Sequence, residues 1–414
     1  MQMSTLKIDT VIVGGGQAGL STSYYLKQQG CDHIILEQAA QAGNAWRNGR
    51  WDSFALLTPN WSFRLPGAEY QDSAPDGFMQ RDEIVTRFEH YIHHFQFPIQ
   101  YQQRVISIEQ STGGTGYLVR TEDAEVQARN VVIATGLYQK PKIPSFSADL
   151  STRITQLHSG EYRNPRQIPP GAVLVVGSAQ SGCQITEELY ESGRRVYLCT
   201  GSAGRAPRRY RSRDVYEWLH LSGFLDRTFD KLPSPKAKFA GNPHVSGRDG
   251  GHTLNLHQFA RDGVVLLGRV QGGREGRIGL ASDLYENLAN ADQFEAEVVK
   301  LIDSFITQTG LDAPAESLPE LRDGYAADVI TDIDLDSAGI TTIIWAMGYR
   351  FDFDLVKLPV FDEDGYPVQR RGVTDYPGLF FVGLPWLYKQ KSGLLIGVGE
   401  DAEYVASAIA GRAA

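Results

Sequence analysis

Ile12-Val13-Gly14-Gly15-Gly16-Gln17-Ala18-Gly19 is the stretch of sequence that decides the fold. It follows an apolar, β-branched run and precedes a segment whose apolar spacing predicts a helix over residues 17–29. Gly14, Gly16 and Gly19 stand in the GxGxxG register. The first glycine permits a tight turn, the second lets the backbone approach a pyrophosphate, and the third lets helix and strand pack closely. Because the helix N-terminus presents amides and partial positive charge, the stretch predicts a dinucleotide-binding loop.

A carboxylate follows this loop at the distance that such a site needs. Ile34-Ile35-Leu36 predicts the second strand of the unit, and Glu37 ends it, 23 residues after Gly14. An acid in that place binds the ribose hydroxyls of the dinucleotide. Since strand, loop, helix and acid occur together, a chance glycine turn is an improbable alternative. We therefore expect Glu37 and the adjacent Gln38 to contact a cofactor.

The same pattern recurs 163 residues later as Val175-Val176-Gly177-Ser178-Ala179-Gln180-Ser181-Gly182. A period of this length is too long for a solenoid, so it indicates a second dinucleotide-binding domain. Gly177, Ala179 and Gly182 take the three loop positions. The methyl group of Ala179 is tolerable there and sets the pyrophosphate slightly further from the backbone.

The second unit has no acid at the end of its second predicted strand. Val196-Tyr197-Leu198-Cys199 ends at Thr200 rather than at Asp or Glu, and Arg205 and Arg208 follow. Loss of the acid together with nearby arginine favours a 2′-phosphate, and therefore NADPH over NADH. NADH is the alternative donor, and the arginines would then form a solvated or interdomain face.

The order of the predicted elements indicates an α/β protein with two Rossmann-like dinucleotide-binding domains, the second inserted into the first. We expect the first domain to be discontinuous, with parts at 1–165 and 336–414. The inserted domain spans 166–335 and carries a stretch without a clear pattern at 205–325. Further expected elements are helices over 81–96, 214–222, 292–306 and from about 400, a meander over 105–126, and strands over 131–133, 342–345 and 379–382.

Composition narrows the classes of protein. The chain has 414 residues, 42% hydrophobic and 21% charged, which predicts a globular protein of two or three domains. A net charge of −9 argues against a nucleic-acid partner. The N-terminus lacks a basic segment followed by an apolar run, and no stretch of about 18 apolar residues occurs. We therefore expect a cytoplasmic protein that does not bind a membrane.

The chain has few residues for thiol or metal chemistry. Its three cysteines, Cys31, Cys183 and Cys199, are too scattered for a disulfide framework, a cysteine-rich metal site or a redox dithiol. His90 and His94 stand four residues apart and could ligate a metal. Because aromatic residues surround them in a helical pattern, an amphipathic surface helix is the better interpretation, and no metal site is expected.

Several further segments resemble the flavin-containing monooxygenases, the class B single-component group of two-domain flavoproteins. The segment 43–47, GNAWR, resembles the family's GGTWR segment, which lies along the flavin. Residues 134–136 (ATG) and 346–348 (AMG) resemble its two interdomain linkers, and HSGEY at 158–162 resembles the end of its identifying motif. Residues 380–386 with Ser392-Gly393 resemble its final FAD-contacting segment. The resemblance covers 8–200 and 341–410 well and 205–325 poorly.

The resemblance implies FAD in the first domain and NADPH in the second. Taken with the loops above, it gives the expected cofactor-binding residues: Gly14, Gly16, Gln17, Ala18, Gly19, Glu37, Gln38, Asn44, Ala45, Trp46, Thr58, Val105, Ala134, Thr135, Gly136, Gly177, Ala179, Gln180, Ser181, Gly182, Thr200, Arg205, Arg208, Met347, Gly348, Gly383, Leu384 and Leu395.

The catalytic candidates lie where the sequence departs from the family. The family often has Asn directly after Thr in an LxTN segment, whereas Leu57-Thr58-Pro59-Asn60 places the asparagine one residue later. We expect Asn60 and Gln180 as polar groups near the junction of flavin and nicotinamide. The upstream half of the identifying motif is absent, with Thr152 and Ile154 at its Phe and Gly positions. His158 is expected to bridge backbone between domains rather than to transfer protons.

The resemblance implies a monooxygenase that forms a C4a-(hydro)peroxyflavin and transfers one oxygen atom from O2 to nitrogen, sulfur or a carbonyl of a small organic substrate. A flavin oxidoreductase or dehydrogenase without oxygen insertion is the second hypothesis, and a catalytically inactive nucleotide-binding regulator is the third. The stretch 205–325 mixes aromatic with charged residues, which suits either a substrate entrance or a contact between copies of a homo-oligomer.

Overall fold

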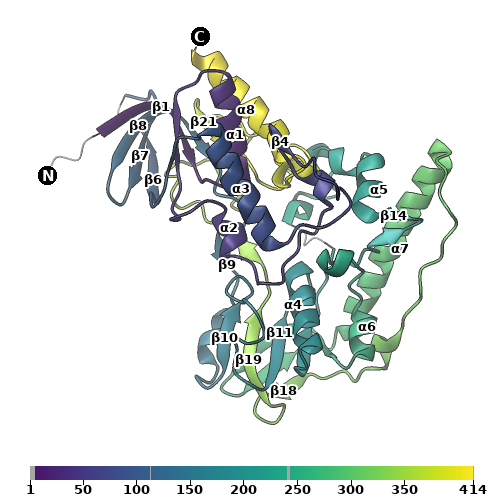
Figure 1. The fold of residues 1–414 in the computed structure, drawn as a ribbon. Coiled ribbons are helices and arrows are strands. Elements are labelled where there is room, and N and C mark those ends of the chain that lie inside the picture. Colours follow the sequence, from purple (N-terminus) through teal and green to yellow (C-terminus); the bar gives the residue numbers. More distant parts are fainter. Residues whose placement is uncertain (1–4, 112, 240–242, 414) are drawn as a thin grey trace.

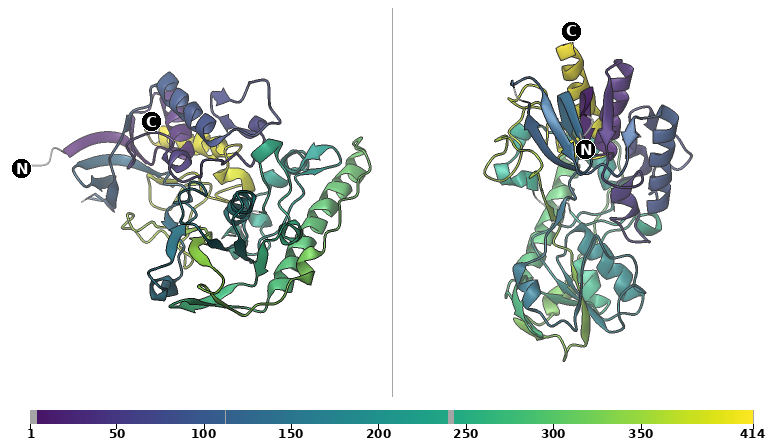
Figure 2. Two further views of the ribbon diagram at one scale, coloured as in Figure 1. Left: turned by 60° about the horizontal axis from the view of Figure 1, so that its bottom comes forward. Right: turned by 90° about the vertical axis from the view of Figure 1, so that its left-hand side faces the viewer.

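The structure is a computed structural model that describes residues 5–111, 113–239 and 243–413. Two sheets organise it, and helices cover their faces, as predicted for an α/β protein (Figure 1). In the right-hand view of Figure 2 the two units lie one above the other and meet at a narrower waist. Strand β1 (Thr5–Val13) and helix α8 (Val398–Ala413) both belong to the upper unit, so the two ends of the chain build one domain.

The first sheet has seven strands in the order β5-β2-β1-β8-β7-β6, with β21 paired to β8. Strand β1 lies parallel to both β2 and β8, and β6, β7 and β8 form the predicted antiparallel meander. The run 131–133, expected as a strand of its own, is the end of the long strand β8. The other strands of this sheet are β2 (His33–Leu36), β5 (Ile99–Gln100), β6 (Val105–Gln110), β7 (Tyr117–Thr121), β8 (Glu125–Ile133) and β21 (Leu379–Phe381).

The second sheet is parallel throughout, in the order β10-β19-β11-β12-β15. It reaches beyond the boundaries expected from the sequence, because β10 lies before residue 166 and β19 lies after residue 335. The expected limits followed the Pro-rich connector, whereas the pairing of β10 with β19 draws both flanks into this sheet. Its strands are β10 (Thr155–His158), β11 (Ala172–Val176), β12 (Val196–Cys199), β15 (Val265–Leu267) and β19 (Ile340–Trp345).

Helices pack on both sheets through apolar faces. In the first unit α1 (Gln17–Gln28) packs against α8, and α3 (Arg81–Phe95) buries Ile84 and Phe88. His90 and His94 are exposed on α3. In the second unit α4 (Gln180–Glu191) covers β11 and β12. None of the helices in the described residues is long and apolar enough to cross a membrane.

The stretch 205–325 contains helices α5 (Val215–Leu221), α6 (Leu256–Arg261) and α7 (Leu284–Thr309). The helix expected over 292–306 is the second part of α7, which begins earlier because Leu284 and Leu288 are buried against the second unit.

The remaining short helices and strands of the described chain are α2 (Asn44–Arg47), β3 (Arg64–Leu65), β4 (Ala68–Glu69), β9 (Lys140–Pro141), β13 (Arg209–Tyr210), β14 (Arg213–Asp214), β16 (Val270–Arg274), β17 (Arg277–Leu280), β18 (Asp332–Asp334) and β20 (Tyr349–Arg350).

The chain passes between the two units twice, and the two passages are joined. After β8 the chain forms β9, and after β19 it forms β20, and these two short strands pair antiparallel. The Lys142 amide also donates to the Gly348 carbonyl at 2.9 Å. The two passages are therefore held together as a two-stranded ribbon rather than running as separate linkers.

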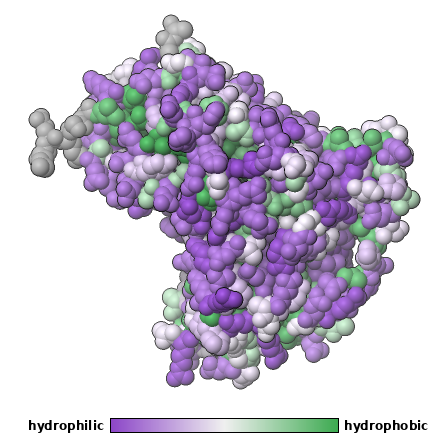
Figure 3. Space-filling model, in the orientation of Figure 1, coloured by the Kyte–Doolittle hydropathy of each residue, from purple (hydrophilic) through white to green (hydrophobic). Residues whose placement is uncertain are grey.

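The surface shown in Figure 3 is mostly hydrophilic. A hydrophobic patch appears at the upper left, over the edge where Figure 1 places β1, β6 and β7. Leu6 and Ile106 are exposed there, at 43% and 46%.

Candidate dinucleotide and flavin site

The first glycine loop lies between β1 and α1, and two of its glycines are required by packing. Gly14 has φ of +107°, and a Cβ there would lie 2.5 Å from the Ala134 carbonyl oxygen. A Cβ at Gly19 would lie 1.9 Å from the Gly14 carbonyl oxygen. Strand, turn and helix can therefore approach one another only with glycine at these two positions.

Gly16 differs because no protein atom demands a glycine there. It is exposed, and a Cβ at this position would meet nothing within 4 Å. It is also the N-cap residue of α1, so no side-chain oxygen caps the amides of the first helical turn. This open cradle beside free helix amides fits the pyrophosphate of a dinucleotide.

Glu37 lies at the end of β2, next to the loop. Its Oε2 accepts from the Gly15 amide at 2.6 Å, and its Oε1 accepts from the Ala39 amide at 2.8 Å. The parallel pairing of Val13 with Leu36 brings this carboxylate to the same sheet edge as the loop. Its position fits recognition of ribose hydroxyls, and the adjacent Gln38 is exposed.

The second loop repeats this geometry between β11 and α4. Gly177 has φ of +109°, and a Cβ there would lie 2.6 Å from the Ala346 carbonyl oxygen; a Cβ at Gly182 would lie 1.7 Å from the Gly177 carbonyl oxygen. Ala179 occupies the N-cap position of α4, with φ of −78° and ψ of −170°. These angles are close to those of Gly16, −83° and −171°, at the N-cap position of α1. Each loop therefore rests on one interdomain linker, and each helix starts without a side-chain cap.

The C-terminal segment closes the first site. Gln17 Nε2 donates to the Gly393 carbonyl at 2.9 Å, and a Cβ at Gly383 would lie 2.5 Å from Ala18 Cβ. Leu384 and Leu395 are buried behind these contacts. The segment that resembles the family's final FAD-contacting segment is thus packed on the first turn of α1.

The interdomain linkers are fixed by hydrogen bonds near both loops. Thr135 Oγ1 accepts from Gln139 Nε2 at 2.6 Å, and Gly136 and Gly348 have φ of +77° and +76°. His158 Nε2 lies 3.1 Å from the Gly348 carbonyl oxygen. Since burial lowers the pKa of His158, the neutral imidazole is favoured, which agrees with the expected bridging role.

Both expected catalytic amides bind backbone. Asn60 is buried, and its side chain donates to the Ala74 carbonyl at 3.0 Å and accepts from the Met79 amide at 2.8 Å. Gln180 donates to the Val245 carbonyl and accepts from the Val245 amide at 3.1 Å. These contacts hold the loops 74–79 and 244–252 in place, a positioning role that the sequence did not indicate.

The expected 2′-phosphate arginines are engaged elsewhere. Arg205 is buried and pairs with Asp292 at 2.8 Å and Glu295 at 2.7 Å, and Arg208 pairs with Asp214 at 2.5 Å. The interdomain alternative therefore describes them better, since Arg208 Nη1 also donates to the Leu57 carbonyl in the first unit. Their charge is balanced by carboxylates and is not presented to a nucleotide.

The other expected cofactor residues are spread over the two loops and the junction between the units. Thr200 is buried at the end of β12, where its Oγ1 donates to the Leu267 carbonyl at 2.7 Å. Asn44 Oδ1 accepts from Asn48 Nδ2 at 2.8 Å. Val105 is buried in the first sheet, Met347 and Ala45 are exposed, and Trp46, Thr58 and Ser181 are half-buried.

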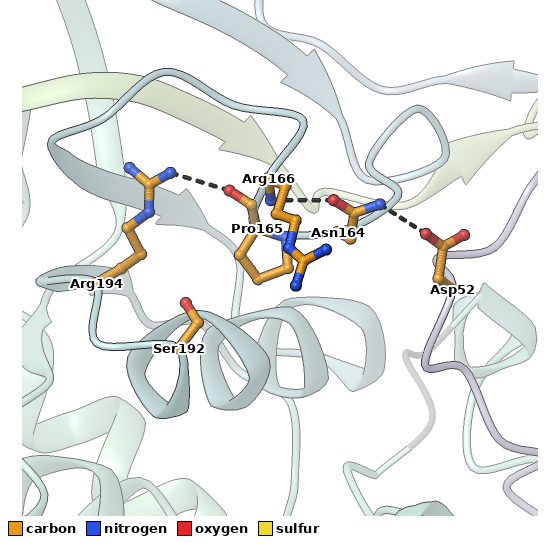
Figure 4. A pocket seen from close by; sticks show the side chains of 6 residues that line it. All are labelled: Asp52, Asn164, Pro165, Arg166, Ser192 and Arg194. Atoms are coloured by element: carbon orange, nitrogen blue, oxygen red, sulfur yellow. Dashed lines mark hydrogen bonds between the residues drawn. The ribbon is translucent and has the colours of Figure 1, made fainter.

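No sequence pattern indicated a contact between α4 and the first unit. Glu188 accepts from Tyr162 Oη and from Ser53 Oγ, both at 2.7 Å. Near it, Asp52, Asn164, Pro165, Arg166, Ser192 and Arg194 line a cleft of about 670 Å³ (Figure 4). The cleft lies at the C-terminal end of α4, whereas the second loop precedes its N-terminal end, so it is not the dinucleotide site.

A histidine beneath the second loop gives a pH prediction. His244 is fully buried, and burial together with Arg205 lowers its pKa to about 3. Because the folded pKa lies below the unfolded value near 6.5, the stabilisation is complete above pH 6.5 and is lost as pH falls. We expect His244→Phe to flatten the acid-side decline in unfolding free energy by about 1.4 kcal/mol per pH unit below pH 6. Chemical denaturation from pH 7 to 5 measures this, with the exposed His93→Phe as control; equal slopes would contradict it.

The fold and both loops define the chain as a two-domain flavin- and nicotinamide-dependent oxidoreductase. Its fold is that of the flavin-containing monooxygenase from Stenotrophomonas maltophilia, with TM-score 0.66, 20% identity and coverage of 99% of this chain and 100% of that one. The ornithine N-hydroxylase of Kutzneria sp. 744 gives TM-score 0.66 at 18% identity, covering 99% and 100%.

The chain belongs to the pyridine nucleotide-disulphide oxidoreductase family, whose model matches residues 11–222. The oxidoreductase CzcO of Bacillus subtilis (strain 168) is 31% identical over 405 residues, 98% of this chain and 99% of its own length. A CzcO-like oxidoreductase of Geobacillus kaustophilus (strain HTA426) is 33% identical over 400 residues, 96% and 97% of the two chains.

Proposed function

We propose that this protein is an FAD- and NADPH-dependent monooxygenase that transfers one oxygen atom from O2 to a small organic substrate. The observation that carries the proposal is the paired arrangement of Gly16 and Ala179. Two uncapped helix N-termini, each beside a loop that rests on an interdomain linker, fit one dinucleotide each. When bound, the flavin supplies the electron-transfer and oxygen chemistry, and the protein orients it.

The residues of the chain would divide the work between the two loops. The amides at the start of α1 and the Glu37 carboxylate would hold FAD, and the amides at the start of α4 would hold the nicotinamide nucleotide. NADPH is proposed as the donor because Thr200, which follows β12, stands in place of the acid that would repel a 2′-phosphate. Arg205 and Arg208 do not support this preference, since carboxylates already bind them. Dissociation constants for NADPH and NADH test it directly.

The cysteines argue against thiol chemistry, although the family name includes disulphide reduction. Cys183 and Cys199 are buried, and burial raises the pKa of both thiols, that of Cys199 to about 12. Cys31 lies after α1 in the other unit. Neither buried thiol can act as a thiolate at neutral pH.

A cysteine-free variant tests this point. We expect Cys31→Ser, Cys183→Ala and Cys199→Ala together to retain NADPH oxidation, because no thiol contributes to it. The small cavities left in the second unit should cost about 1–2 kcal/mol of stability. Steady-state NADPH oxidation with a thermal unfolding scan measures both effects. Loss of turnover in a folded, flavin-loaded variant would contradict the proposal.

One experiment separates the three hypotheses for the function. The purified protein is assayed for bound flavin, and NADPH oxidation is then followed with and without O2 in the presence of amines, thioethers and ketones. Oxygenated product formed in step with NADPH oxidation is the expected result. Hydrogen peroxide without product across the panel would favour the oxidoreductase without oxygen insertion. Bound nucleotide without NADPH oxidation would indicate the regulator.

A further inference from the structure

Arg50 is a buried cation for which the described residues supply no carboxylate partner, unlike the other buried lysine and arginine side chains in that part of the chain. Four other lysine and arginine side chains are less than a tenth exposed within the described part of the chain, and each pairs with at least one carboxylate: Arg205 with Asp292 and Glu295, Arg208 with Asp214, Lys238 with Asp362, and Lys391 with Asp226 and Glu400. Arg50 is only 8% exposed, yet no carboxylate of the described residues lies within 4.0 Å of it. A buried unpaired charge is unfavourable, so this site is built for an anion from outside the chain.

Aromatic rings surround the Arg50 guanidinium and leave most of its N–H donors without an acceptor. Its central carbon lies 4.4 Å from the ring centroid of Tyr138 and 5.4 Å from those of Trp46 and Phe54. Aromatic faces stabilise a cation, but they accept no strong hydrogen bonds. The one hydrogen bond found for Arg50 in the described structure is from Nη1 to the Gly49 carbonyl at 2.8 Å. Because a guanidinium carries five N–H donors, most remain for a ligand.

Arg50 lies where both interdomain linkers meet the segment 44–50. Tyr138 follows the first linker, and its ring lies 5.1 Å from that of Tyr349, which directly follows the second linker at Gly348. Residue 346 of the second linker is the one that packs on Gly177 of the second loop. Arg50 therefore stands at the junction of the two units, against Tyr138 of the first passage and, beyond that ring, Tyr349 of the second.

The strand order decides which part of a dinucleotide reaches this place. In the second sheet β11 lies between β12 and β19, and the second loop follows β11. The adenosine end of a dinucleotide lies at the end of the second strand of its unit, here β12. Its other end must then cross the N-terminus of α4 towards β19, and Tyr349, which follows the linker after β19, lies against Tyr138 and so close to Arg50. The phosphate closest to that linker belongs to the nicotinamide half.

We infer that Arg50 binds the diphosphate of the nicotinamide dinucleotide, through the phosphate nearer the nicotinamide ribose. This inference rests on the proposed function, because it requires a dinucleotide in the second loop. A planar guanidinium suits two phosphate oxygens at once, and the aromatic rings fix its plane. The diphosphate is common to NADPH and NADH, so Arg50 sets affinity for both and does not select between them.

The test is titration calorimetry of the flavin-loaded protein with NADP⁺ and with NAD⁺. We expect Arg50→Gln to raise the dissociation constant of both nucleotides about 10- to 100-fold and by the same factor. Arg50→Lys keeps the charge but loses the planar guanidinium that can bind two oxygens at once. Its dissociation constants should lie between those of the wild type and those of Arg50→Gln. The midpoint of thermal unfolding without nucleotide should stay the same or rise in Arg50→Gln, because an unpaired buried charge is removed.

Arg163→Gln is the matched control, since Arg163 lies near the same junction with its donors on the carbonyls of Gly160, Tyr162 and Asn48. Arg163→Gln should be less stable than the wild type, and its dissociation constants for NADP⁺ and NAD⁺ should be unchanged. If the wild-type protein binds neither nucleotide, the proposed function and this inference both fall. If the wild type binds and Arg50→Gln binds equally well, only the inference is overturned. Weaker binding of NADP⁺ alone would place Arg50 at the 2′-phosphate and would also overturn it.

Discussion

Gly16→Leu should yield a folded protein without bound flavin. The backbone at Gly16 has φ of −83°, which any residue adopts, and a side chain there meets no protein atom. Stability should therefore change by less than about 0.5 kcal/mol. A leucine would, however, fill the cradle beside the first turn of α1, and overpacking of that space should weaken flavin binding by about 3 kcal/mol, roughly 100-fold.

Flavin absorbance per mole of purified protein measures this effect, and circular dichroism checks the fold. Gly411→Leu is the matched control, because Gly411 is an exposed glycine of α8 whose Cβ would also meet nothing within 4 Å. A Gly16→Leu protein that keeps a full complement of flavin would show that the pyrophosphate does not approach this loop.

Ala179→Leu should give the complementary result in the second unit. Its backbone, φ −78° and ψ −170°, is extended, so the larger side chain adds no backbone strain. Flavin content should be normal, because the first loop is untouched. The dissociation constant for NADPH should rise about 10- to 100-fold, corresponding to an overpacking cost of about 1–3 kcal/mol.

Calorimetric titration and the rate of anaerobic flavin reduction both report on this variant. Ala289→Leu, on the exposed face of α7, is the control for the same chemical change within the second unit. Loss of flavin from Ala179→Leu would contradict the assignment of one cofactor to each loop. Unchanged affinity for NADPH would contradict a nucleotide at α4.

The features that could be predicted best from the sequence are those formed by residues close together in the chain. The glycine loops and Glu37 could be recognised because strand, turn and helix follow one another within about 25 residues. The linkers could be recognised by resemblance, although the pairing of β9 with β20 joins residues about 200 positions apart. Whether β10 and β19 belong to the second sheet also depends on pairing between distant residues. A domain boundary placed at a proline cannot anticipate that pairing.

Charged side chains were the least predictable, because their partners come from distant elements. Arg205 looked available for a phosphate, but Asp292 and Glu295 lie 87 and 90 residues further along the chain. Arg50 gave no signal at all, since the ring of Tyr138 reaches it only through the fold. Arg50 could be singled out as a candidate diphosphate ligand only once it was known which charges the protein itself neutralises.

The ribbon of β9 and β20 has a consequence for how the two units can move. Two independent tethers would let the second unit twist, slide and swing relative to the first. Paired strands resist sliding against each other, so the pairing of Tyr349 with Pro141 and of Arg350 with Lys140 keeps the two linkers in register. Contacts away from the ribbon restrain the units further, because Arg208 donates to the Leu57 carbonyl and Ser53 donates to Glu188 of α4. Arg50 and His158 both lie beside this ribbon, so a dinucleotide bound there would meet a junction whose two linkers are tied together.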